Sequence, residues 1–419
     1  MKIKLKKEIF KVEYIIFTFL WPLLIMPKTI SLGTFLLIGL VLCYKNKSKL
    51  LIDKITITMW VMCTIHIISI MHNAMFLNSD TSRIPAAINT ALLWFVAGLF
   101  YSVYRCIGTK LNIDTIGYIC CINIVVLFVL GIFTAYLWFV RGELNYVIFG
   151  RALFDTTYLD GEAGTKFIGL NEFSNMNLFF VMLMVMLSYT YLKKRKLITK
   201  TAILVMASIC VLLIHSRSGY VLFAISIFYM YYGFVPRKYK KVLLFVVILM
   251  TGVVFSLEFR ELYLLFNNKI LNGNVSSNNF RLLLLTTSWQ EALEKSPIIG
   301  MGIKRYLFEG YPLGSHSTYI GFFYKTGIVG LILGLFVIIK LNYNVCKRIV
   351  CNTDFKPMLV FLISFIVLFA IEDVDGANWS IVLYFTSLAL LYSNNYEKRG
   401  RNEHKNFSNI STTVSSNRV

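Results

Sequence analysis

The chain of 419 residues is 57% hydrophobic and 15% aromatic, and it carries a formal net charge of +21 at pH 7. Its mean hydropathy of +0.68 excludes a soluble globular protein, because such a fold cannot bury so much apolar surface. The totals therefore predict a polytopic membrane protein. Since backbone polar groups in lipid must be satisfied within the spanning segments, the long apolar runs are expected to be helices and the fold class all-α.

The predicted elements are about twelve apolar runs, each judged against the ~20 residues that a helix needs to cross a bilayer. The basic start of the chain resembles a signal sequence, but no small-residue cleavage site follows, so we interpret the first run as a retained helix. We expect a single transmembrane bundle over residues 1–393 and a disordered cytoplasmic tail over 394–419, which is polar and rich in Ser and Asn. The runs lie near residues 9–27, 29–44, 54–76, 86–107, 114–140, 173–192, 200–216, 219–235, 241–257, 318–340, 357–371 and 377–393.

The positive charge is distributed unequally between the two predicted sides of the membrane. Most of the 42 Lys and Arg residues fall in every second gap between the runs, for example at 45–47 and 193–196, whereas acidic residues slightly outnumber basic ones in the other gaps. This asymmetry follows the positive-inside rule, so it reports topology and does not indicate a nucleic-acid partner. Both termini are then expected in the cytoplasm.

Two of the predicted external loops are long, 141–172 and 258–317, and the second joins the ninth and tenth spans. Long ordered loops in compact proteins are usually functional. The predicted cytoplasmic loops are short and contain no Gly-rich phosphate-binding motif, so the chemistry is expected on the outer side. We expect the second loop to carry part of the active site and to move with Gly300, Gly302 and Gly314 as joints.

Arg217 lies in the motif His-Ser-Arg-Ser-Gly at residues 215–219, between two spans of about sixteen or seventeen residues. At 1.5 Å per residue each span reaches roughly 25 Å, which is short of a ~30 Å apolar core. The tip of this hairpin should therefore hold Arg217 near headgroup depth, where a guanidinium needs an anion. Binding of a lipid-linked phosphate is one reading, and snorkelling toward lipid headgroups is the other.

Arg281 and His316 are the other two candidates for chemistry. Arg281 falls in the first turn of a predicted helix, where its charge adds to free N–H groups in an anion site; an ion pair with Glu258 or Glu261 is the alternative. His316 precedes the span at 318–340, and the positive end of that helix disfavours a protonated imidazole. A neutral ring could act as general base on a sugar hydroxyl, although an interfacial histidine is more often structural.

Two further polar features lie in or near the last spans. Lys325 falls inside a predicted span and is expected to make a separate polar contact such as an ion pair. The sequence Glu-Asp-Val-Asp at 372–375 is similar to the metal-binding Asp-x-Asp of nucleotide-sugar enzymes. That match is short and falls on the wrong side for nucleotides, so sugar binding or a structural role is favoured.

The combined motifs resemble one family, that of O-antigen ligases and Wzy-type O-antigen and capsular polysaccharide polymerases. The resemblance is specific over about residues 201–334 and is otherwise one of topology. It implies a GT-C-like, metal-independent glycosyltransferase of the bacterial cytoplasmic membrane. The matching residues are the motif at 215–219, then Arg281, Trp289, Ala292, Pro297, Gly300 and Gly302, and then His316, Ser317, Tyr319, Gly327 and Gly330.

The resemblance implies roles for three residues. Arg217 and Arg281 would neutralise the diphosphate leaving group of an undecaprenyl-diphosphate-linked oligosaccharide, and His316 would take the proton of the attacking hydroxyl. Many members carry an acid where this chain has Lys325, so no role is transferred to that position. Residues 26–28, in the first external turn, contain no acid, which agrees with a mechanism in which arginines replace a metal.

We therefore predict a repeat-unit polymerase that transfers the lipid-linked glycan en bloc to an incoming lipid-linked repeat unit at the outer face of the membrane. Ser218, Tyr319 and Arg151 are further predicted substrate-binding residues. No cofactor, metal or nucleic acid is expected; the lipid bilayer is a partner, and a chain-length regulator and a flippase are candidate partners.

Three alternatives remain on the sequence alone. A ligase of the same family would transfer the glycan to another acceptor. A lipid-oligosaccharide flippase or transporter could also have twelve spans, but it would be expected to show related halves, charged spans and short external loops. A membrane scaffold would leave Arg217, Arg281 and His316 unexplained.

Overall fold

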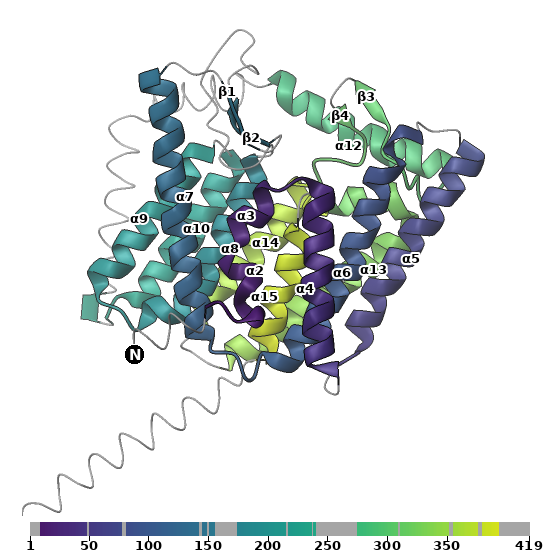
Figure 1. The fold of residues 1–419 in the computed structure, drawn as a ribbon. Helices are drawn as coiled ribbons and strands as arrows, with labels where there is room; N and C mark the ends of the chain where they lie inside the picture. The colour runs from purple at the N-terminus through teal and green to yellow at the C-terminus, as the bar shows by residue number, and fades with distance from the viewer. Residues whose placement is uncertain are drawn as a thin grey trace, which may run out of the picture.

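The structure is a computed structural model, and it describes residues 9–47, 50–77, 81–141, 145–148, 151–155, 174–214, 217–236, 238–239, 275–308, 311–351, 355–375 and 379–393. Over these ranges the protein is a bundle of helices with two short pairs of strands at one end (Figure 1). The predicted all-α, polytopic membrane fold is confirmed.

The predicted spans coincide with helices, except for the span near 241–257, which lies outside the described residues. The helices are η1 (Val12–Tyr14), α2 (Ile15–Thr18), α3 (Leu20–Ile25), α4 (Lys28–Lys45), α5 (Lys54–His72) with its π-helical extension η3 (Asn73–Leu77), η4 (Thr81–Arg83), α6 (Ile84–Ile107), α7 (Ile113–Arg141), α8 (Ser174–Lys193), α9 (Leu197–Ile214), α10 (Arg217–Phe234), α12 (Val275–Lys295), α13 (Thr318–Val350), α14 (Pro357–Ile371) and α15 (Ser380–Ser393).

Four helical stretches in the described ranges are long and apolar enough to cross a membrane by length and composition. They are Lys54–Leu77, Ile84–Ile107, Ile113–Leu137 and Thr318–Val350. Shorter apolar helices accompany them at Ile30–Lys45, Leu178–Lys193, Leu197–Leu212, Gly219–Phe234, Pro357–Ile371 and Ser380–Ser393.

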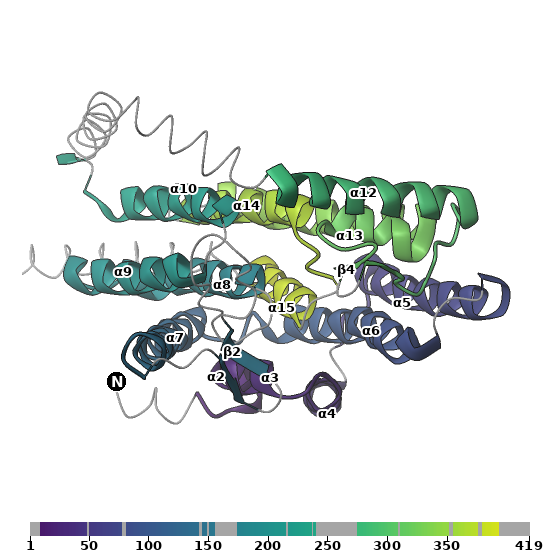
Figure 2. The same ribbon diagram turned by 90° about the horizontal axis from the view of Figure 1, so that it is seen from above.

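The helices lie in layers, as the view from above shows (Figure 2). One row contains α10, α14 and α13, the next contains α9, α8, α15 and α5, and α7 and α6 lie beyond it. Large aromatic side chains fill the interior: Trp94 of α6 and Tyr384 of α15 are fully buried. The Phe35 ring of α4 stacks on Trp379 with 4.1 Å between the ring centroids.

Two predicted spans differ in detail from the helices. The first is broken, because α2 ends at Thr18 and α3 begins at Leu20, with Phe19 at φ −103° and ψ 29° between them. The span predicted to end at residue 340 continues to Val350, so the basic pair Lys347 and Arg348 lies in the last turn of α13 and not in a loop. With 33 residues, α13 has more than the ~20 residues that a helix needs to cross a bilayer.

The helix α13 is interrupted at Gly327, which has φ 63° and ψ −164°. Backbone from residues 297–302 fills the interruption. The Ile328 N–H donates to the Pro297 carbonyl (2.9 Å), and the N–H of Gly302 donates to the Lys325 carbonyl (2.9 Å). The broken helix therefore completes its hydrogen bonds with a segment of the preceding loop, as buried backbone requires.

The glycines of this segment lie where backbones pack closely, and their role as joints stays a prediction. Gly300 and Gly302 have φ of 77° and 66°, in the left-handed region that favours glycine. A Cβ on Gly300 would overlap the backbone at Gly327, and one on Gly302 would overlap the backbone of α5 at Ser69. These residues are glycines because three backbones approach closely here.

Both long loops contain structure at the same end of the bundle (Figure 1). Strands β1 (Asn145–Ile148) and β2 (Arg151–Asp155) form one antiparallel pair. The amphipathic helix α12 and the antiparallel pair β3 (Tyr306–Phe308) and β4 (Tyr311–Pro312) belong to the second loop. The second loop thus delivers its structured parts to the start of α13.

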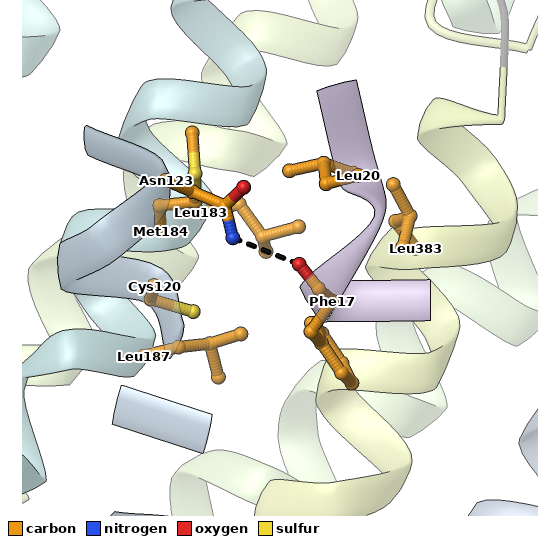
Figure 3. A pocket seen from close by; sticks show the side chains of 8 residues that line it. All are labelled: Phe17, Leu20, Cys120, Asn123, Leu183, Met184, Leu187 and Leu383. Atoms are coloured by element: carbon orange, nitrogen blue, oxygen red, sulfur yellow. Dashed lines mark hydrogen bonds between the residues drawn. The ribbon is translucent and has the colours of Figure 1, made fainter. Parts of the chain in front are cut away.

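A small apolar pocket lies elsewhere, among α2, α3, α7, α8 and α15 (Figure 3). The side-chain amide of Asn123 donates to the Phe17 carbonyl across it (2.8 Å). None of its lining residues is charged, so it offers no group for anion chemistry. The lining residues are Phe17, Leu20, Cys120, Asn123, Leu183, Met184, Leu187 and Leu383.

Candidate active site at the start of α13

His316 is held at the start of α13 by a tight turn. Gly314, at φ 70°, donates its N–H to the Ser288 hydroxyl of α12 (2.8 Å). His316 itself has φ 63°, a conformation that few non-glycine residues adopt. Ser317 then caps α13, with its hydroxyl accepting from the Ile320 N–H (3.4 Å). Together these contacts fix the imidazole just outside the first helical turn.

The turn between α14 and α15 packs against this helix start. We call residues 372–375 the acidic turn, since they read Glu-Asp-Val-Asp. The Thr318 N–H donates to the Glu372 carbonyl (3.0 Å), and the Thr318 hydroxyl donates to the same oxygen (2.6 Å). The Val374 N–H returns a bond to the Thr318 hydroxyl (2.9 Å). The backbone N–H and the hydroxyl of Thr318 thus join the acidic turn to α13.

Arg281 of α12 reaches the same place. Its Nη1 lies 3.5 Å from Oε1 of Glu372, and its side chain is 41% exposed whereas that of Glu372 is 7% exposed. Glu258 and Glu261, the partners considered from the sequence, lie outside the described residues. The guanidinium is therefore positioned by a buried carboxylate yet remains open to solvent and to a ligand.

The pKa of His316 is lowered to about 4, chiefly by burial of the ring and then by the neighbouring positive charge of Arg281. Asp373 opposes this shift and Lys304 adds to it. The imidazole is consequently neutral at neutral pH and can accept a proton. A neutral ring was predicted from the positive end of the helix, whereas burial is the largest cause of the lowered pKa here.

A chain of ion pairs continues from the acidic turn into the bundle. Lys304 and Lys325 both bind Asp373, the latter with 3.6 Å between Nζ and Oδ1. Lys325 also binds Asp375, whose other oxygen accepts from Trp94 Nε1 of α6 (2.7 Å). The predicted ion pair of Lys325 is confirmed. The lysine contacts of the acidic turn agree with the structural role, one of the two roles predicted for it.

The structure describes the side chains of only some of the remaining predicted site residues. Arg217 is the first residue of α10 and Arg151 the first of β2, but their side chains and that of Ser218 lie outside the described part of the structure. Tyr319 directs its hydroxyl to the Ile366 carbonyl of α14 (3.0 Å). Of the predicted catalytic residues, the structure brings Arg281 and His316 together.

Lys304 and Trp94 belong to the site region but were missed by sequence reasoning. Lys304 follows the glycine segment with no motif to mark it, and Trp94 is one of many aromatics in an apolar run. A buried lysine in a span, such as Lys325, is the available signal that acidic partners exist, since an unpaired charge there is costly.

Comparison with known proteins identifies part of the chain. Residues 202–335 match a family model described as O-antigen ligase. This range agrees with the 201–334 predicted from the motifs, and it contains Arg217, Arg281 and His316, so the family resemblance is confirmed. No curated protein matches the chain. The match supports, at the level of the family, a membrane enzyme of the O-antigen ligase and polymerase type.

Proposed function

We propose that the protein is an oligosaccharide repeat-unit polymerase of the bacterial cytoplasmic membrane. It transfers an undecaprenyl-diphosphate-linked glycan to an incoming lipid-linked repeat unit at the outer face, without a metal. The observation that carries the proposal is the pairing of a half-exposed guanidinium, Arg281, with a neutral imidazole, His316, inside the matched segment.

The leaving group sets the requirement for arginine. As the bond between the anomeric carbon and the phosphate oxygen breaks, negative charge builds on the diphosphate. Arg281 offers a planar pair of donors for it and is already held near the start of α13 by Glu372. Arg217 is proposed as the second guanidinium, and Ser218, Tyr319 and Arg151 as substrate contacts.

His316 is proposed as the general base. The acceptor hydroxyl attacks the anomeric carbon, its proton moves to the imidazole, and undecaprenyl diphosphate departs. In the ligand-free protein the low pKa of His316 makes it a weak base. A bound diphosphate would raise that pKa, because a nearby negative charge favours the protonated ring. The base would thus gain strength only when the donor is present.

Purified protein in liposomes with lipid-linked repeat units tests the proposal. The wild type should form polymer, and His316→Ala should form none while retaining the elution profile and thermal unfolding of the wild type. Polymer of normal length from the folded His316→Ala variant would refute the assignment of the base.

A ligase is the second candidate, favoured by the description of the matched family model. It would use the same donor and the same residues but a different acceptor. Lipid-linked repeats supplied as the sole acceptor separate the two, since a polymerase extends them whereas a ligase leaves them unextended. Product formation only after addition of another glycolipid acceptor would favour the ligase.

A further inference from the structure

The ion pairs behind the site form one alternating chain: Lys304, Asp373, Lys325 and Asp375. Side-chain exposure falls along it, from 17% at Lys304 to 10% at Asp373, 2% at Lys325 and 0% at Asp375. The two lysines and two carboxylates balance in charge. The chain therefore runs from the site region into the interior of the bundle without net charge.

All four carboxylate oxygens have a partner. Asp375 uses one oxygen for Lys325 and the other for the indole N–H of Trp94. Asp373 uses one for Lys304 and the other for Lys325. Oxygens that already accept from a lysine or an indole are poorly suited to hold a metal ion or a sugar. Their role is therefore to hold neighbouring parts of the structure in position.

Buried ion pairs are costly to form and contribute to a unique arrangement more than to stability. Here the arrangement that they fix is the acidic turn. Glu372, the residue before Asp373, binds Arg281 through its carboxylate and Thr318 through its carbonyl. A shift of the turn would therefore move Arg281 and would release the first turn of α13 next to His316.

We propose that Lys325 and Lys304 are positioning residues: by holding Asp373 and Asp375 they fix the acidic turn over the start of α13 and thereby place Arg281 and His316 for transfer. This inference rests on the proposed function for its kinetic consequence, but its structural consequence can be measured without any activity.

The chain also acts on His316 through charge. The charged groups that act on this imidazole are Arg281 of α12, Asp373 of the acidic turn and Lys304 of the segment before β3, with Glu372 neutralising Arg281. Removal of Lys304 should favour protonation of His316, and removal of Asp373 should disfavour it. The pKa of His316 should therefore shift in opposite directions when Lys304 and when Asp373 is replaced. A general loss of stability would not produce opposite shifts.

The structural test uses the double variant Lys325→Met with Asp375→Asn, which removes one buried lysine and one buried carboxylate together and leaves Asp373 paired with Lys304. Hydrogen–deuterium exchange should become faster at the amides of Thr318 and Val374, which bond across the interface between the turn and α13. The matched control is Lys194→Met, which breaks the 2.7 Å pair with Asp114 on other helices and should leave these amides unchanged. Unchanged exchange in the double variant would overturn the proposal, even if the wild type shows no transfer.

The kinetic test compares the same double variant with Lys304→Met and Asp373→Asn. The double variant should transfer glycan at least about tenfold more slowly, as expected when a base is misplaced. In kcat/KM against pH, Lys304→Met should move the acidic limb to higher pH and Asp373→Asn should move it to lower pH. Wild-type transfer rates and wild-type pH profiles in all folded variants would overturn the proposal. If the double variant fails to fold, the shift of the acidic limb in Lys304→Met decides, because the Lys304 side chain is partly exposed.

Discussion

His316 combines two unusual properties in one residue. Its φ of 63° is uncommon outside glycine, and such conformations persist only where surrounding contacts determine them. Its pKa of about 4 results chiefly from burial. An unusual backbone conformation and a buried, neutral ring therefore coincide at one residue.

The low pKa predicts how activity depends on pH. The acidic limb of kcat/KM reports the pKa of the base in the free enzyme, so transfer by the wild type should stay constant from pH 7 down to about 5. Protein incubated at pH 5 and returned to pH 7 should recover full activity, which controls for unfolding. A limb near the ordinary histidine value of about 6.5 would contradict the environment described for His316.

Arg281 should be far more sensitive to substitution than a comparable arginine. Arg281→Lys keeps the charge but loses the planar pair of donors, so kcat should fall by about 10²-fold, the scale observed for loss of one donor to a developing anion. Arg305→Lys is the matched control: Arg305 lies 3.3 Å from Glu291 and is 50% exposed. Equal losses of rate in the two variants would remove the special role of Arg281.

At this scale the sequence predicted single residues better than their partners. The position of His316 before a helix and of Arg281 within a helix could be inferred from local pattern. The pairing of Arg281 with Glu372, 91 positions later, could not, because it depends on how α12 and the turn after α14 both pack against α13. The position of Lys325 in an apolar run predicted that it has an acidic partner. The sequence did not indicate which of the acidic residues these partners are, namely Asp373 and Asp375.

Among the elements, α13 shows what hydropathy can and cannot predict about a helix. An apolar run locates the helix, but it contains no signal for the break at Gly327, because glycine is tolerated within many helices. The break depends on residues 297–302, whose backbone replaces the missing bonds. The extension to Val350 was missed because basic residues suggested a loop, whereas cations also suit the last turn of a helix.

Substitution of the packed glycines should test this arrangement. Gly302→Ala would place a Cβ against the backbone of α5 at a φ of 66°, so the thermal unfolding temperature in detergent should fall clearly. Gly33→Ala is the control, because a Cβ on Gly33 of α4 meets nothing within 4 Å. It should be neutral or slightly stabilising, by about 0.4–1 kcal/mol. Equal unfolding temperatures for both variants would contradict the close packing at Gly302.

For the whole molecule, charge predicts orientation. The last turns of α4, α6, α8 and α13 carry basic residues, and the helices run so that these turns lie at the end opposite α12 and the strand pairs (Figure 1). By the positive-inside rule, we propose that this basic end faces the cytoplasm. The site at the start of α13 would then face outward, as the proposed transfer requires.

Cysteine labelling tests this orientation. In a variant with Tyr306→Cys as its sole cysteine, a membrane-impermeant maleimide should react in intact spheroplasts, since Tyr306 is 47% exposed on the loop end. A variant that retains only Cys351, which is exposed just after α13, should react only after permeabilisation. The reverse pattern would place the site in the cytoplasm and would exclude the proposed transfer.

The overall fold was largely predictable, since composition fixes the membrane class and apolar runs locate the helices. The layers in which the helices pack were not, because apolar residues face both lipid and protein and carry little information about neighbours. For the same reason, the sequence could not show that α6 and α15, far apart in the chain, bring Trp94 and Tyr384 into one core.

The interruption of α13 has a consequence for maturation of the protein. The N–H groups of Ile328 and Val329, just after Gly327, donate to the carbonyls of Pro297 and Ile298, in a segment synthesised shortly before. A nascent α13 that entered lipid alone would expose these groups to hydrocarbon at a cost of several kcal/mol each. Residues 297–302 thus supply acceptors to the helix that follows them. This part of the loop and α13 would therefore have to come together as the helix packs into the bundle.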